Sequence, residues 1–446
     1  MEPRDLDSQI ARAVRGMAGA APVPPALDDL SPVIAVRRRR ARRLLVAGTA
    51  SCVVLAAGGI AVALSTGGAT GPGVHVSPAD SSPTDCVVAP TTSASPPADF
   101  ADGTWSELPP SPLGPRAQAS YVWTGTEIIA FGGEMLAEGA SDGPRREDGA
   151  AYDPVTGTWR AIADAPLAPR SDQHAVWTGS EMIVFGGNEE SLTGLTDGAA
   201  YDPTSDTWRP LADPPLDGLR NSVAAWTGTE LVVWDSVHGG ARYDPCADAW
   251  TRMAPAPDGF LGDAAYGSAS VWTGDEVVVW GGATGTNFPL DTAAAYRTAT
   301  DTWRAVPPPP RGAAYAADPV WSGSELLAWG RSNLFAAPRD EIGVAYDPAT
   351  DAWRELPAAP LERADQSEGS TFPPAVWAGD RLLAWTGNLD RAGQLALAYD
   401  PATDAWTRLP PAPEDVGDLA YASLLWTGRQ LVVVGTGGRA IAFGAP

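Results

Sequence analysis

The chain has 446 residues, a formal net charge of −24, 48 glycines, 43 prolines and 18 tryptophans. So acidic a chain argues against nucleic-acid binding, which needs a basic face, and the complete lack of lysine excludes Schiff-base and lysine-nucleophile chemistry. Glycine and proline mark tight turns and tryptophan supplies large buried areas, so the composition predicts many short strands with short connections.

Residues 1–43 form a basic segment with nine arginines against five acidic residues. Within it, apolar side chains recur at helical spacing, at Leu6, Ile10, Val14 and Met17. This short pattern fits a helix in residues 1–36 that docks onto a cytoplasmic protein partner. It also fits a helix that lies on the membrane or forms only transiently, and both interpretations stay open.

The run Arg37–Arg43 is followed directly by Leu44–Leu64, which is 21 residues without a charge. That length suits a helix crossing about 30 Å of hydrocarbon, so we expect a single transmembrane helix at 44–65. The arginines predict a single-pass protein of the cell membrane, with its N-terminus in the cytoplasm and its C-terminal part outside the cell. A cleaved signal peptide is the alternative, since Ala61-Val62-Ala63 fits a cleavage site, but the long preceding region favours an uncleaved anchor.

Residues 66–99 are rich in Ser, Thr, Pro, Gly and Ala and are predicted to form a disordered stalk. Of the three cysteines, Cys52 lies in the apolar run, Cys86 in the stalk and Cys246 in a later turn. A Cys86–Cys246 disulfide is compatible with a location outside the cytoplasm, and two unpaired thiols are the alternative.

Residues 100–446 contain an internal repeat marked by two rows of tryptophans. The first row is Trp105, Trp159, Trp208, Trp250, Trp303, Trp353 and Trp406. The second row is Trp123, Trp177, Trp226, Trp272, Trp321, Trp377 and Trp426. Each unit reads as a strand ending in a second-row Trp, a tight hairpin, an apolar strand, a variable loop, a strand ending near Tyr-Asp-Pro, and a strand carrying a first-row Trp.

Four strands per unit of about fifty residues predict a β-propeller, because one unit cannot bury both of its faces and must stack on its neighbours. The repeat begins with a fourth strand around Trp105 and ends with a third strand, Arg439–Phe443. We therefore expect an all-β, seven-bladed propeller that the N-terminal outer strand closes by pairing with the last blade.

The repeat resembles kelch repeats in three features, namely Gly-Gly after the second strand, the Tyr-Asp-Pro turn, and a Trp seven residues beyond that Tyr. Blade 3 departs from the pattern, with Asp235-Ser236 in place of Gly-Gly, and blade 4 has Arg297-Thr298 in place of Asp-Pro. The resemblance implies a kelch-type propeller, by fold alone in the galactose-oxidase superfamily. The basic tail, anchor and outer domain also look like those of membrane proteins with anti-sigma-like signalling tails.

The short, repetitive hairpins and Asp-Pro turns share one end of the propeller and are interpreted as structural, with the turn aspartates accepting backbone N–H groups. The variable loops share the other end, where ligands bind on rigid scaffolds. The residues expected to bind a ligand there are Arg116, Arg170, His174, Arg220, Arg311, Arg331, Arg363 and Asn388. They would form a basic pocket for an acidic glycan or peptide carboxylate; alternatively, each arginine pairs with a neighbouring acid and ties blades together.

Kelch propellers include copper radical oxidases and a sialic acid epimerase, so the resemblance allows an enzyme. The copper site of the former needs two histidines and a Tyr–Cys crosslink, whereas this propeller has only His174 and His238, and its one cysteine, Cys246, lies at the other end. We expect no catalytic residues, metal or cofactor. The function predicted is a protein- or carbohydrate-binding module, with a glycan- or sialic-acid-active enzyme and a transmembrane signalling regulator as alternatives.

Overall fold

The computed structural model describes residues 100, 103–135, 143–189, 194–219, 221–257, 260, 266–283, 292–309, 319–331, 341–361, 374–386, 394–413, 419 and 422–444. All of them belong to the unit Ala79–Pro446. The predicted cytoplasmic tail, transmembrane helix and stalk (1–43, 44–65 and 66–99) lie outside the described residues. Among the described residues, no helix has the length and apolar character that a membrane span requires.

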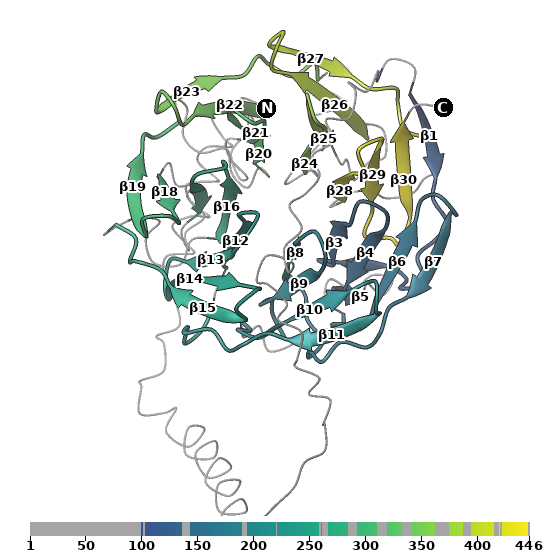
Figure 1. Ribbon diagram of the computed structural model, residues 1–446. Coiled ribbons are helices and arrows are strands. Elements are labelled where there is room, and N and C mark those ends of the chain that lie inside the picture. Colours follow the sequence, from purple (N-terminus) through teal and green to yellow (C-terminus); the bar gives the residue numbers. More distant parts are fainter. Residues whose placement is uncertain are drawn as a thin grey trace, which may run out of the picture. The chain divides into compact units, whose positions relative to one another are not determined.

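Seven four-stranded antiparallel sheets stand around a central axis, so the chain is a seven-bladed β-propeller (Figure 1). Blade 1 contains β3 (Ser120–Trp123), β4 (Ile128–Phe131), β6 (Gly149–Asp153) and β7 (Thr158–Ala161). Blade 2 contains β8 (His174–Trp177), β9 (Met182–Phe185), β10 (Gly198–Asp202) and β11 (Thr207–Pro210). Blade 3 contains β12 (Val223–Trp226), β13 (Leu231–Asp235), β14 (Gly239–Asp244) and β15 (Ala249–Arg252).

The next three blades repeat the same order of strands from the axis outward. Blade 4 contains β16 (Tyr266–Trp272), β17 (Val277–Ala283), β18 (Ala293–Arg297) and β19 (Thr302–Val306). Blade 5 contains β20 (Val320–Trp321), β21 (Leu326–Arg331), β22 (Glu341–Asp347) and β23 (Ala352–Glu355). Blade 6 contains β24 (Ala375–Trp377), β25 (Leu382–Thr386), β26 (Leu395–Asp400) and β27 (Ala405–Arg408).

Blade 7 combines strands from both ends of the propeller sequence. Its inner strands are β28 (Ser423–Trp426), β29 (Gln430–Val434) and β30 (Ala440–Gly444), and its outer strand is β1 (Thr104–Glu107). In the β1–β30 ladder, Thr104 lies opposite Gly444 and Trp105 lies opposite Phe443. A two-stranded ladder of β2 (Arg116–Ala117) and β5 (Glu134–Met135), which the repeat did not predict, lies beside blade 1.

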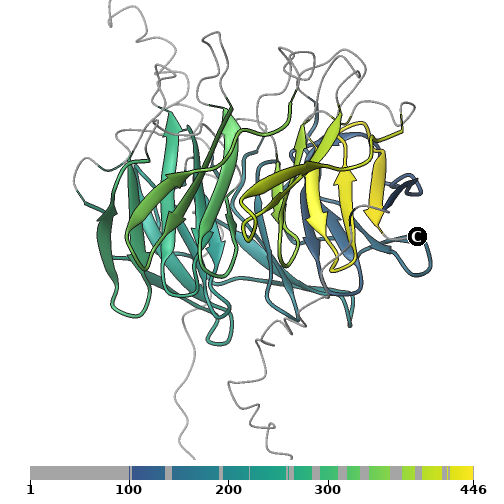
Figure 2. The ribbon, with the colours of Figure 1, turned by 90° about the horizontal axis from the view of Figure 1, so that it is seen from above.

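The strand ends define two faces of the propeller (Figure 2). The turns between first and second strands and between third and fourth strands lie on one face, which we call the hairpin face. The connections between second and third strands, and from each blade to the next, lie on the opposite loop face. This division follows from antiparallel pairing, which places alternate connections at opposite ends of a sheet.

The first-row tryptophans join each blade to the one before it. Each indole N–H donates to a backbone carbonyl of the preceding blade's outgoing connection, at 2.6 to 3.0 Å. Each indole also packs on the aromatic ring opposite it on the third strand, which is a tyrosine in six blades and Phe443 in blade 7, with ring centroids 4.9 to 5.1 Å apart. Seven equivalent junctions therefore connect seven blades into a ring.

Candidate functional site

The first strands of the blades face the axis, and their starting ends surround a pocket at the loop face, which we call the channel-mouth pocket. It is formed by the beginnings of β3, β8, β24 and β28, from blades 1, 2, 6 and 7. Its volume is about 460 Å³, within the usual range of ligand sites. The residues that line it are Ser120, Tyr121, Gln173, His174, Ala175, Pro374, Ala375, Ala422, Ser423 and Leu424.

Gln173 is the most unusual member of this pocket. Its side chain is only 6% exposed, and its Nε2 donates to the carbonyl of Phe131 at 2.8 Å. Its Oε1 atom is buried and accepts no hydrogen bond from any of the described residues. An unpaired buried amide oxygen costs free energy. A ligand that donates a hydrogen bond to Oε1 of Gln173 would therefore be favoured at this pocket.

His174 lies beside Gln173, and the structure places this predicted residue at the pocket. Its Nε2 is 2.9 Å from Oγ of Ser222 on the neighbouring blade. Burial lowers the pKa of His174 to about 4, and its hydrogen bond with Ser222 only partly opposes that shift. The imidazole is therefore neutral at physiological pH and offers hydrogen bonding without a charge.

The remaining polar groups of the pocket are also uncharged. Ser120 donates from Oγ to the backbone carbonyl of Gln173 at 2.6 Å, which joins blades 1 and 2. Burial raises the pKa of Tyr121 to about 12, although the nearby Arg116 opposes this shift, so the phenol keeps its proton. The described wall of the pocket is thus polar and neutral.

Arg116 and Arg170 lie close to the loop face, but their guanidinium groups are turned into the protein. Arg116 donates to the carbonyls of Leu113 and Gly132 and makes two bonds of 2.7 and 2.8 Å to the carboxylate of Asp148. Arg170 is fully buried, and its partners are the carbonyls of Ala168, Gly186 and Asp197 and the Asp197 carboxylate. Both arginines hold the loop that follows the second strand of a blade.

The other predicted ligand-binding residues contribute less to the described site. Arg331 ends β21, where its backbone pairs with Glu341. Arg220, Arg311, Arg363 and Asn388 lie outside the described residues. The structure therefore brings together His174 with Gln173, Ser120 and Tyr121, and sequence reasoning did not select the last three, because Gln173 and Tyr121 occupy positions that no repeat marks.

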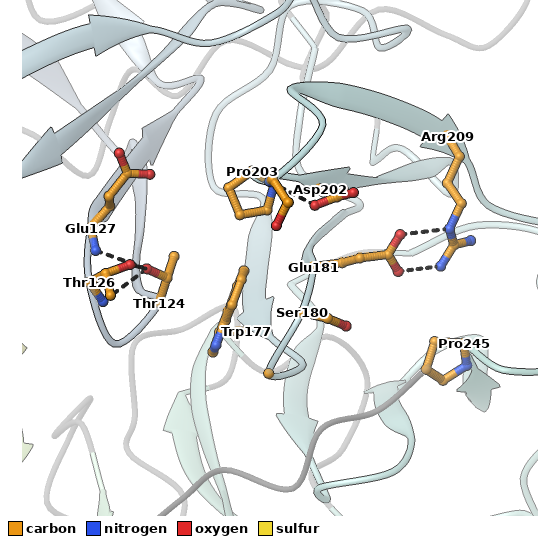
Figure 3. Close-up of a pocket in the computed structure, with 12 residues that line it drawn as sticks. Thr124, Thr126, Glu127, Trp177, Ser180, Glu181, Asp202, Pro203, Arg209 and Pro245 are labelled. Atoms are coloured by element: carbon orange, nitrogen blue, oxygen red, sulfur yellow. Dashed lines mark hydrogen bonds and ion pairs between the residues drawn. The ribbon is translucent and has the colours of Figure 1, made fainter. Parts of the chain in front are cut away.

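A second hollow lies on the hairpin face, across blades 1 to 3 (Figure 3). We call it the hairpin-face groove; its volume is about 710 Å³. The hairpin around Thr124 forms one end and Pro245 forms the other, with Trp177 and Pro203 between them (Figure 3). Trp177 is half-buried, and its indole N–H has no acceptor among the described residues.

Behind this groove lies a chain of polar groups that repeats around the ring. Glu181, in the first hairpin of blade 2, binds Arg209 through two bonds of 2.6 and 2.9 Å. Arg209 donates to the hydroxyl of Tyr243 in blade 3, and that hydroxyl donates to Asp248 at 2.6 Å. We call this the Glu–Arg–Tyr–Asp bridge, and it joins one blade to the next.

Four blade pairs contain the bridge in this form. Its members are Glu127–Arg160–Tyr201–Asp206, Glu181–Arg209–Tyr243–Asp248, Glu276–Arg304–Tyr346–Asp351 and Glu325–Arg354–Tyr399–Asp404. Burial raises the pKa of Tyr201, Tyr346 and Tyr399 to about 12. Bonds from the tyrosine hydroxyls lower the pKa of Asp206, Asp248 and Asp351, so the tyrosines are donors and the aspartates acceptors.

Between blades 3 and 4 the bridge is rearranged. Thr251 replaces the arginine, and its cross-strand partner Arg242 binds Glu230 and the carbonyl of Thr298 in blade 4 instead. Tyr296 still donates to Asp301 at 2.7 Å. The arginine of this junction therefore lies on the third strand of blade 3 and not on the fourth, and it still joins blade 3 to blade 4.

The predicted role of the turn aspartates is confirmed. Side-chain oxygens of Asp153, Asp202, Asp244, Asp347 and Asp400 accept the backbone N–H two residues later, at 2.7 to 2.8 Å. No group of three or more His, Cys, Asp or Glu side chains that could hold a metal ion occurs among the described residues.

Cys246, in the hairpin-face turn of blade 3, is disulfide-bonded. The other two cysteines of the chain, Cys52 and Cys86, both lie outside the described residues. The bond therefore connects blade 3 to a residue beyond the described part of the structure.

Comparison of the chain with models of known protein families and with curated protein sequences finds no match. The fold and the two hollows thus define the class, a seven-bladed β-propeller with a neutral polar pocket at the axis.

Proposed function

We propose that the protein is a membrane-anchored, extracytoplasmic, kelch-type propeller that binds a hydroxyl-rich ligand, a neutral carbohydrate, in the channel-mouth pocket. The observation that carries this proposal is the buried, unpaired Oε1 of Gln173 beside a neutral imidazole. A sugar hydroxyl can donate to Gln173 and accept from or donate to neighbouring hydroxyls, and it needs no counter-charge.

The neutral ligand replaces the acidic ligand that the arginines suggested. The guanidinium groups of Arg116 and Arg170 already have carboxylate and carbonyl partners inside the protein. An acidic sugar in the pocket would have to compete for them, which would leave Asp148 and Asp197 without their cation. Hydroxyl recognition imposes no such cost.

The kelch assignment rests on the repeated residues and on what the glycines do. Gly133 and Gly187, second in their Gly-Gly pairs, have positive φ values of 90° and 91°. A Cβ on either would lie 2.7 to 2.8 Å from a backbone carbonyl oxygen, so no side chain fits there. The location outside the cytoplasm is supported by the arginine-flanked apolar run and by the disulfide of Cys246, a bond that persists in oxidising compartments.

The test is an array of neutral glycans, sialylated glycans and peptides probed with the full-length protein in detergent or nanodiscs. We expect binding to neutral glycans, weakened about tenfold by Gln173→Leu, the effect of one lost hydrogen bond. Thr126→Ala on the hairpin face serves as the control and should leave binding unchanged. Binding should also change little between 0.05 and 0.5 M salt, since screening acts on charged pairs.

Three outcomes would contradict the proposal. Preference for sialylated glycans with a steep salt dependence would restore the acidic-ligand hypothesis. Binding to peptides alone would make the propeller a protein-binding module, and neutral-glycan binding that Gln173→Leu does not weaken would move the site elsewhere.

A further inference from the structure

We infer that the hairpin-face groove is occupied by the protein's own proline-rich stalk, residues 87–99, which the disulfide of Cys246 ties across this face. Two fixed points carry the inference. One is Cys246, which adjoins Pro245 at one end of the groove and is disulfide-bonded. The other is Phe100, where the stalk meets the propeller.

Cys86 is the partner that the chemistry of the chain favours. Cys52 lies in the middle of the uncharged run Leu44–Leu64, and a thiol inside a bilayer cannot reach a turn of the outer domain. Cys86 lies in the stalk, 14 residues before Phe100. A Cys86–Cys246 bond therefore brings the stalk to the hairpin face of blade 3.

Phe100 fixes the other end of the stalk beneath blades 6 and 7. It is 6% exposed, its ring stacks on Phe443 with centroids 6.3 Å apart, and it lies 5.9 Å from the ring of Trp426. The guanidinium of Arg381, in the first hairpin of blade 6, lies 5.6 Å from the same ring. Trp426 and Arg381 flank hairpins, so Phe100 enters from the hairpin face.

The groove follows the path between these points. From Pro245 in blade 3 it passes Trp177 in blade 2 and ends at the Thr124 hairpin of blade 1, which neighbours blade 7 (Figure 3). Fourteen steps of extended, proline-type chain cover about 43 Å at ~3.1 Å per residue. Neighbouring sheets pack about 10 Å apart face to face, so the three steps from blade 3 to blade 7 span roughly 30 Å and the stalk is long enough to follow the groove.

The chemistry of the groove matches that of the stalk. Residues 87–98 carry no charge and include Pro90, Pro96 and Pro97. Two of the three acids that line the groove, Glu127 and Glu181, are paired with arginines. The third, Asp202, accepts bonds from Thr204 and Ser205 of its own turn. An extended proline-rich segment leaves its carbonyls free, and the unpaired indole N–H of Trp177 is a donor for one of them, with the ring as a stacking surface. The strap itself is independent of what the channel-mouth pocket binds.

The first test is disulfide mapping of the full-length protein by mass spectrometry without reduction, with its mass measured in parallel. We expect a Cys86–Cys246 crosslink within one chain. A bond from Cys246 to Cys52, or a crosslink between two copies, would overturn the inference.

The second test measures occupancy of the groove by hydroxyl-radical footprinting of the full-length chain. In Cys86→Ser/Cys246→Ser, oxidation of Trp177 should rise at least threefold, while Trp272, the matching residue of blade 4, should not change. The triple variant Pro90→Ala/Pro96→Ala/Pro97→Ala keeps the crosslink and should also expose Trp177. A synthetic peptide of residues 87–99 should protect Trp177 again in the cysteine variant. Unchanged oxidation of Trp177 in both variants would show that the stalk lies elsewhere.

Discussion

Five of the seven junctions between blades carry a polar bridge at the hairpin face, whereas the two junctions of blade 7 lack this bridge. Between blades 6 and 7, Phe443 replaces the tyrosine, Thr407 replaces the arginine and Arg381 replaces the glutamate of the hairpin. Between blades 7 and 1, Ser106 replaces the arginine and Gly157 replaces the aspartate. Of the bridge members at these two junctions only Tyr152 remains, so the ionic part of the bridge is lost at both.

Apolar packing takes the place of the bridge where the two ends of the propeller meet. Phe100, Trp105 and Phe443 pack with Trp385 and Leu383 of blade 6 in one buried cluster. Such packing depends little on pH or salt, whereas the bridge depends on ionised groups. The two junctions of blade 7, which we call the blade 7 seam, therefore rely on β1 pairing and aromatic burial. The other five junctions are held by ion pairs as well as by packing.

The largest effect is expected from Trp105→Ala, which tests the seam. The change removes the 2.7 Å bond to the carbonyl of Pro410 and ring contacts with Trp385 and Phe443. We expect the free energy of unfolding to fall by about 3–5 kcal/mol, the usual cost of truncating a packed aromatic. Chemical denaturation measures it.

The matched control is Trp353→Ala, at the same position of blade 5. There the Arg304–Tyr346–Asp351 bridge still joins the two blades, so we expect a loss smaller by about 1 kcal/mol, the net value of a hydrogen bond or two. Equal losses for the two variants would show that the seam has no special dependence on its tryptophan.

The second prediction concerns acid. The pKa of His174 is about 4 in the folded protein, against about 6.5 when unfolded. The unfolded state binds more protons between these values, so stability is complete above pH 6.5 and falls as the pH drops toward 4. We expect a loss of about 3 kcal/mol across this window.

His174→Gln should remove this part of the pH dependence, and hydrogen exchange should locate it in blades 2 and 3 and not at the blade 7 seam. The bridge aspartates act in a different window. Their lowered pKa values mean that their contribution is present above about pH 4 and is lost only at lower pH. Unchanged acid sensitivity in His174→Gln would contradict the assignment to this imidazole.

The third prediction breaks the bridge itself. Arg209→Ala leaves Glu181 and Tyr243 without their shared partner, and we expect a loss of about 1–2 kcal/mol, kept modest because the pair is partly exposed to solvent. Thr407→Ala, at the same position of blade 6, should cost less than about 0.5 kcal/mol. A double-mutant cycle with Glu181→Gln should give a coupling energy that falls as salt is raised, and a zero coupling at low salt would contradict the bridge.

The repeat predicted the number and order of the blades, because aromatic rows and turn residues recur in register. The alternative that each arginine pairs with an acid is confirmed for Arg116 and Arg170. The acids themselves could not be named in advance, since Asp148 and Asp197 lie in variable loops 32 and 27 residues away. The bridge could have been found from sequence, because the hairpin glutamate and the arginine after the first-row Trp recur together in blades 1, 2, 4 and 5. Gln173 has no counterpart in other blades, and an unpaired atom is a property of packing that no pattern carries.

The smallest effect is expected from substitutions of Gly157. Pro109 helps to explain why this position holds a glycine and not the aspartate of blades 2 to 6. In blades 2 to 4 the equivalent aspartates receive a backbone N–H from Ala163, Ala212 or Ala254 of the preceding connection. Pro109 stands at that position before blade 1 and has no N–H to give, and Ser106 supplies no guanidinium. An aspartate at 157 would lack both donors, while glycine takes the required φ of 67° at no steric cost.

Gly157→Asp should therefore change the free energy of unfolding by no more than about 0.5 kcal/mol, since a bond from Tyr152 offsets the cost of the left-handed backbone. Gly157→Val, a β-branched residue at the same φ, should lose about 1–2 kcal/mol. Adding Ser106→Arg to Gly157→Asp restores the missing cation and should recover about 0.5 kcal/mol, a gain that high salt removes. If the double variant gains nothing at low salt, the apolar seam excludes the bridge for a reason other than its missing donors.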